Sequence, residues 1–159
     1  MTWHENLAEA NWIHLGYLAA NTSSLLVPLS KGKVLNLTPK DSDLLKQQAQ
    51  FFDAAVSGWA SFEEPALLFQ KPEHAFVQPA GALEIATEIY SAVHGGPVGD
   101  PNQFRGELQT YGNLLKRIAD GETLTTEELP TARNLSTFLD ALMSKARAVI
   151  HESARTTRY

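Results

Sequence analysis

The chain has 159 residues, a net charge of −5 and no cysteine. This length suits one domain, and a hydrophobic share of 43% is too high for a disordered chain. The lack of cysteine excludes disulfides, thiolate metal sites and a cysteine nucleophile. No apolar run reaches the roughly 18 residues of a membrane span. The first residues also lack the basic start and apolar middle of a signal peptide, so we expect a single cytosolic domain.

Charge is distributed unevenly along the chain. Residues 131–159 hold 5 of the 13 Lys and Arg but only 2 of the 18 Asp and Glu, a net +3, which leaves −8 on residues 1–130. The negative total argues against nucleic acid and against an anionic membrane surface, because both require several basic contacts. The asymmetry predicts a basic C-terminal end beside an acidic body.

A first helix is expected over residues 2–20, opened by a capping box of Thr2 and Glu5. It is apolar on two nearly opposite sides, one formed by Trp3, Leu7, Ala10, His14 and Tyr17, the other by Ala8, Trp12, Leu15 and Ala19. Such a helix lies at the centre of a bundle or in an interface. Trp3 and Trp12 are therefore candidate contacts for a protein partner or a second copy.

His14 and Tyr17 are the candidate ligand-binding residues of this helix. A histidine here can act as a proton shuttle inside a bundle pocket, with Tyr90 or Tyr111 nearby. The competing interpretation is a core histidine that is hydrogen-bonded to a carbonyl or a water. The position one turn later is Leu18, so no second metal ligand follows, and we expect neither a metal nor a cofactor.

The helical period is lost after Asn21, and residues 25–37 are interpreted either as a minor β-hairpin or as an ordered loop over the bundle. Helix-start and helix-stop signals then divide the next part of the chain. They predict helices over residues 39 to about 58, 62 to about 70 (short), 79–94 and 101–119.

The closing helix has the clearest pattern, from residue 125 to about 154. Thr125 and Glu128 form a capping box, and apolar residues then recur at steps of three and four. The opposite face carries Arg133, Asp140, Arg147, His151 and Arg155. It is either a solvated face with cations near the helix C-terminus or a partner-binding surface, in which Arg133, Arg147 and Arg155 would be the contacts.

Arg147 and His151 also resemble the Arg-then-His signature of HEPN-type ribonucleases, which sits near the start of a late helix. That signature has four to six residues between the two, whereas three stand here, and the polar residue beside the arginine is missing. The resemblance implies, as a minor alternative, an RNase that uses this pair.

No phosphate loop, dinucleotide fingerprint, HExxH or nucleophile elbow is present. We therefore predict an all-α antiparallel bundle of about five main helices plus one short helix. The expected function is a non-catalytic interaction or regulatory protein that acts through a helical surface. The alternatives are a ligand-binding or enzymatic bundle with its pocket at His14, and the HEPN-like RNase.

Overall fold

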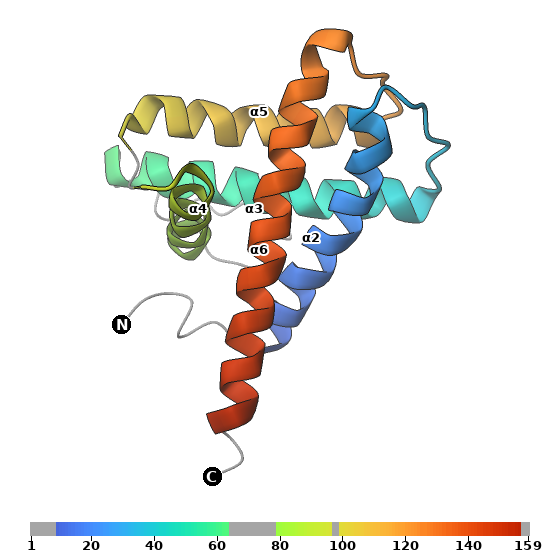
Figure 1. Ribbon diagram of the computed structural model, residues 1–159. Helices are drawn as coiled ribbons and strands as arrows, with labels where there is room; N and C mark the ends of the chain where they lie inside the picture. The colour runs from blue at the N-terminus through green and yellow to red at the C-terminus, as the bar shows by residue number, and fades with distance from the viewer. Residues whose placement is uncertain (1–8, 64–78, 97–98, 157–159) are drawn as a thin grey trace.

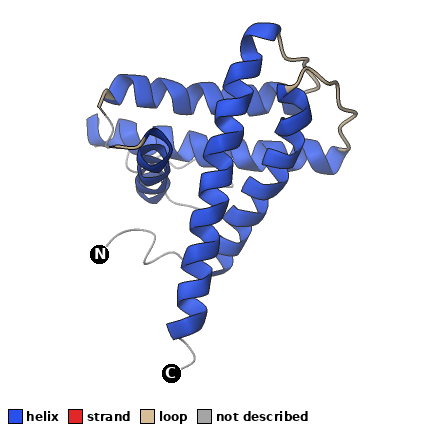
Figure 2. Ribbon diagram, viewed as in Figure 1, coloured by secondary structure: helices blue, strands red, loops and turns tan. Residues whose placement is uncertain are grey.

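The computed structural model describes residues 9–63, 79–96 and 99–156. All secondary structure in these ranges is helical, as Figure 2 shows: α2 (Glu9–Ser30), α3 (Pro39–Glu63), α4 (Pro79–His94), α5 (Pro101–Ala119), the 3-10 helix η2 (Thr126–Glu128) and α6 (Leu129–Thr156). The all-α prediction is confirmed for these residues. Within the same ranges, no helix combines the length and the hydropathy of a membrane span. The short helix expected near residues 62–70 falls mostly outside the described part.

The helices form two antiparallel pairs that cross steeply, α2 with α6 and α3 with α5 (Figure 1). Contacts along α2 and α6 fix their opposite directions, because Gly16 lies against Ala146 while Ser30 lies near Arg133. α4 packs on α3 and also touches α6.

The core lies where the two pairs cross. Phe52 of α3 packs its ring against Tyr111 of α5 at 5.7 Å and against Phe138 of α6 at 5.5 Å. Burying an aromatic or large aliphatic side chain contributes about 1.5–3 kcal/mol, so this crossing joins the two pairs into one core. Trp12, Leu15, Leu26 and Leu108 are also buried in or against it.

The region of residues 25–37 is not a hairpin in this structure. Its first part continues α2 to Ser30, and residues 33–38 form an irregular connection, which agrees with the loop alternative. The helical period persists through residues 21–24 because Thr22 and Ser23 occupy buried positions between Ala19 and Leu26. These two inward polar residues hide the period in the sequence.

Predicted helix starts are confirmed by their capping geometry. Thr38 and Asp41 exchange hydrogen bonds of 3.1 Å, each side chain accepting from the other residue's backbone N–H, before α3. The Asp100 carboxylate accepts from the backbone N–H groups of Asn102 and Gln103 at the start of α5. These bonds satisfy donors that the first helical turn leaves free.

Candidate functional site

The two sides of α2 differ sharply in exposure. Trp12, Leu15, Ala19 and Leu26 are buried. On the other side Ile13 is 53% exposed, Tyr17 48% and Val27 42%. At 100° per residue these three side chains fall within an arc of about 80°. We call Ile13, Tyr17 and Val27 the α2 stripe.

The helical segment that carries the α2 stripe is almost free of charge. From residue 10 to residue 30 the helix contains no Asp, Glu, Lys or Arg, and its one histidine is His14. The Asn21 amide donates to the Tyr17 carbonyl at 2.8 Å, and the Ser24 hydroxyl donates to the Ala20 carbonyl at 3.0 Å. Because these donors are already bonded within the helix, covering them with a partner costs little.

The candidate contact Trp12 is a core residue, since only 1% of it is exposed. Its assignment to a partner surface was wrong because a helix that is apolar on two sides does not reveal which side the rest of the chain covers. Trp3 lies outside the described residues. Tyr17 is on the surface rather than in a closed pocket, and His14 beside it is partly buried.

The basic face of α6 is partly engaged in holding α2. The Arg133 guanidinium donates to the Ser30 carbonyl at the C-terminus of α2, at 3.3 Å. The Ser23 hydroxyl donates to the Asp140 carboxylate at 2.7 Å and lies 2.9 Å from the Ser136 hydroxyl. These bonds link the helix pair across its buried seam, so Arg133 has a structural role.

Arg147 and His151, the pair of the RNase alternative, are both exposed on α6 and lie one turn apart. Arg155 lies within α6, which ends at Thr156, but its side chain is outside the described part. Neither Arg147 nor His151 is buried, and burial is the usual means of tuning a catalytic side chain.

Tyr90 and Tyr111 were proposed to lie near His14. Tyr90 of α4 packs its ring on Phe104 of α5, and Tyr111 of α5 packs on Phe52 of α3 and Phe138 of α6. Burial raises the pKa of Tyr111 to about 12, with the nearby Glu107 carboxylate adding to the effect. The pKa of Tyr90 is also raised, by burial first and then by Glu107. Both phenols are therefore fully protonated at neutral pH and are unsuited to act as bases.

His94 and Glu107 join this aromatic cluster. The His94 Nε2 lies 3.8 Å from the Glu107 Oε2, and its ring stacks near Tyr90 with centroids 4.0 Å apart. In the sequence His94 marks only the end of a helix. Its partner is thirteen residues further on, in the next helix, so no local spacing signals the pair. The cluster holds α4 against α5.

No group of three or more His, Asp or Glu side chains within the described ranges is arranged to hold a metal ion. Ile13 and Val27 are the surface residues that the sequence did not single out. One signal could have found them, namely the near-absence of charge along a long helix. A helix that is apolar all round needs a packing partner on each of its sides.

No family model matches this chain, and neither a curated protein nor a solved structure does. Its function is therefore inferred from its own side chains.

Proposed function

We propose that this protein is a non-catalytic interaction or regulatory protein of the cytosol that binds through the α2 stripe, and that its partner is a second copy of itself. One observation carries the proposal. Three large apolar side chains, each more than 40% exposed, line one face of a helical segment with no Asp, Glu, Lys or Arg. Exposed apolar stripes of this kind mark interaction surfaces.

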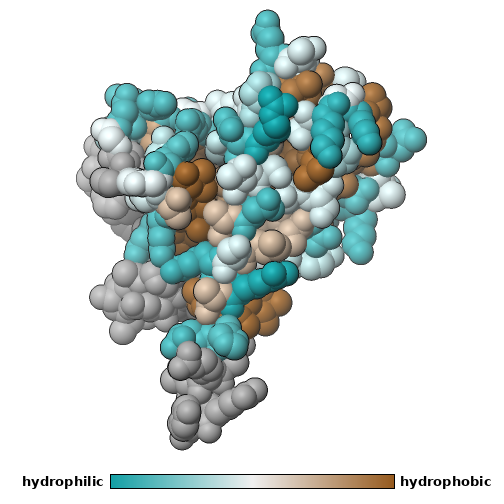
Figure 3. Space-filling view, in the orientation of Figure 1, coloured by the Kyte–Doolittle hydropathy of each residue, from teal (hydrophilic) through white to brown (hydrophobic). Residues whose placement is uncertain are grey.

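The lack of charge favours self-association. In a two-fold symmetric dimer the same surface faces itself, so every charged residue near the axis meets its own like charge. The α2 stripe avoids that repulsion. Tyrosine is also enriched at interface centres, where its ring buries a large area and its hydroxyl finds a polar partner. Figure 3 shows hydrophobic side chains reaching the surface along the α2–α6 pair.

The test is sedimentation velocity of the full chain over a range of concentrations, with native mass spectrometry as a second readout. Tyr17→Glu and Ile13→Glu should each shift a wild-type dimer to monomer, because both bury a charge in the interface. Val34→Glu is the matched control, since Val34 is 77% exposed but lies outside the stripe. Circular dichroism should show unchanged helix content in all three variants.

A wild-type protein that stays monomeric at high concentration would contradict self-association. Loss of the dimer in Val34→Glu alone would place the interface elsewhere. Trp12→Ala is not a suitable variant, because truncating a buried tryptophan costs about 3–5 kcal/mol of stability.

The RNase alternative predicts that Arg147 and His151 face each other across a dimer cleft, and both are exposed as this requires. RNA cleavage by the wild type that is lost in His151→Ala would support it. Cleavage that persists in His151→Ala would point to a contaminant.

A further inference from the structure

The α2 stripe is part of a longer and more regular row of side chains. Ala20 and Ser24 fall inside its arc, at about 20° on either side of Ile13 around the helix. Together with the stripe they follow one another along α2 in alternating steps of four and three: Ile13, Tyr17, Ala20, Ser24 and Val27. Such steps repeat every seven residues and are typical of a helix that packs lengthwise against another helix. We call these five residues the α2 seam.

The α2 seam lies beside the contact between α2 and α6, not within it. Gly16 and Ser23 are the positions that face α6. They lie about 60–80° around the helix from Ile13. Ser24 of the seam is exposed, and Ala20 is partly buried. A second helix can therefore approach the seam while α6 keeps its place next to α2 (Figure 1).

The small residues of the seam form hollows between the large ones. Ala20 follows Tyr17 by one turn, and Ser24 precedes Val27 by one turn. The Ser24 hydroxyl already donates to the Ala20 carbonyl at 3.0 Å, so a partner can cover it without leaving a donor unpaired. In lengthwise helix packing, a large side chain of one helix fills a hollow of this kind on the other.

The order of large and small side chains favours an antiparallel copy of the same helix. The register that sets Ile13 against Ser24 of a second copy also sets Tyr17 against Ala20, because both pairs are symmetric about the same midpoint. Each large side chain then meets a small one. In parallel copies every residue would face itself, and the layers of small residues would leave voids next to the layers of large ones.

Charge and length agree with such a partner. Each copy carries a net charge of −5, so two copies approach most easily at a segment without Asp, Glu, Lys or Arg. From Ile13 to Val27 the seam covers about 21 Å of helix. Standard interfaces involve about 20–30 residues on each side, so we expect a weak dimer whose copies exchange readily.

We propose that two copies of this chain pair through α2 as an antiparallel helix dimer, with Ile13 packed on Ser24 of the second copy and Tyr17 packed on Ala20. This arrangement rests on the proposed self-association and adds its orientation and register. The two-fold axis passes between Tyr17 and Ala20, and Val27 lies at the edge of the contact.

Disulfide formation tests the register, because the chain has no cysteine of its own. Full-length Ile13→Cys and Ser24→Cys, one of them isotope-labelled, are mixed, oxidised mildly and analysed by mass spectrometry without reduction. A disulfide requires Cα atoms within about 7 Å. In the proposed dimer the two copies of residue 13 are about 16 Å apart along the helix, so the mixed 13–24 product should exceed the 13–13 product about tenfold.

Val27→Cys is the matched control for Ser24→Cys. It lies on the same exposed stripe but about 4.5 Å further along the helix. Its mixture with Ile13→Cys should cross-link several-fold less than the mixture of Ile13→Cys with Ser24→Cys.

Ser24→Leu distinguishes a packed seam from a surface that is merely apolar. The substitution adds apolar area but fills the hollow that receives Ile13, so it should weaken the dimer about tenfold in sedimentation equilibrium. Adding Ile13→Ala exchanges the large and the small residue, and the double variant should recover most of the affinity. Ser24→Ala keeps the small size and should change the dissociation constant less than about twofold.

The outcomes separate this arrangement from self-association itself. A tighter dimer in Ser24→Leu, or a 13–13 product as abundant as the 13–24 product, would overturn the antiparallel register and leave self-association in place. A wild type that stays monomeric at millimolar concentration would overturn both. Circular dichroism should show the helix content of the wild type in every variant, because Ser24 and Ile13 are exposed.

Discussion

At the scale of single residues, Gln48 of α3 stands out because it is fully buried and, among the described residues, neither its amide nitrogen nor its amide oxygen has a hydrogen-bond partner. An unpaired buried amide costs roughly 1–3 kcal/mol. Gln48→Met, which keeps the shape and removes the polar atoms, should raise stability by about 1–2 kcal/mol. In a chain of this size that corresponds to a rise of roughly 2–8 °C in Tm, measured by thermal unfolding.

The exposed Gln109 provides the control for that experiment. Gln109→Met should change stability by less than about 0.5 kcal/mol. A decrease in Tm for Gln48→Met would contradict the prediction and would indicate a buried water bonded to the amide.

Glu128 gives a pH-dependent prediction. Hydrogen bonds from Arg117 and Thr125 hold the pKa of Glu128 at about 2, below its usual 4.5. The ionised carboxylate therefore stabilises the fold above about pH 4.5, and this contribution is lost as the pH falls toward 2. Glu128→Gln should cost about 1–2 kcal/mol at pH 7, a range discounted because Arg117 is 41% exposed.

Urea unfolding at several pH values measures this effect. The gap between wild type and Glu128→Gln should shrink by about half at pH 3. Glu127→Gln, at the exposed neighbouring position, should show no such pH dependence. A gap that stays constant with pH would mean that Glu128 acts through packing and not through its charge.

At the scale of helices, close approach of α2 and α6 depends on Gly16. A Cβ at this position would lie 3.1 Å from the Cβ of Ala146, whereas one at Gly106 of α5 would meet nothing within 4 Å. Gly106→Ala should therefore stabilise the protein by about 0.5–1 kcal/mol through helix propensity. Gly16→Ala should destabilise it by about 1 kcal/mol, because the two helices must separate slightly.

Urea denaturation of both variants tests this pair. Adding Ala146→Gly to Gly16→Ala restores the space, so the double variant should recover the steric part of the loss. Stabilisation by Gly16→Ala would show that the α2–α6 seam is looser than the structure has it.

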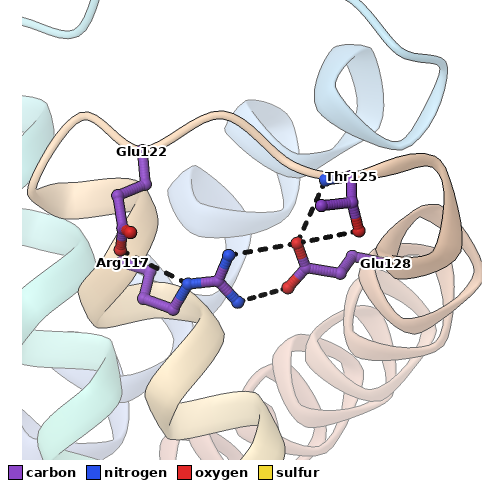
Figure 4. A network of polar contacts seen from close by, with 4 residues as sticks. All are labelled: Arg117, Glu122, Thr125 and Glu128. Carbon is purple, nitrogen blue, oxygen red and sulfur yellow. Dashed lines mark hydrogen bonds and ion pairs between the residues drawn. The ribbon is translucent and has the colours of Figure 1, made fainter.

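The same scale shows how far the sequence predicted the fold. Helices α4 and α5 were predicted with their bounds because Pro79, Pro101 and the glycines after each helix are local signals that tertiary packing does not change. The second half of α2 was missed because Ser23 faces inward, where bonds to Ser136 and Asp140 from a helix over a hundred residues away satisfy it. The Arg117–Glu128 pair bridges the turn between α5 and η2 (Figure 4), so neither residue alone signals it.

At the scale of the whole molecule, two surfaces differ in what would hold a partner. The α2 stripe offers apolar side chains without charge. The basic end of α6 offers cations, since residues 131–159 carry +3 against −8 for the rest of the chain. Each mode responds differently to salt, because salt screens charges and leaves apolar contacts intact.

Ionic strength therefore identifies the interface of a dimer. If the α2 stripe forms it, the dissociation constant from sedimentation equilibrium should change less than about threefold between 50 and 500 mM NaCl, since few charges are buried. An interface between the basic face of α6 and the acidic body should weaken by about tenfold or more over that range. Arg147→Glu serves as the control, because Arg147 is exposed on α6 and is not part of the stripe, and the variant should leave the dimer unchanged. Strong weakening by salt, together with loss of the dimer in Arg147→Glu, would move the interface from α2 to the basic face and leave the apolar stripe without its proposed partner.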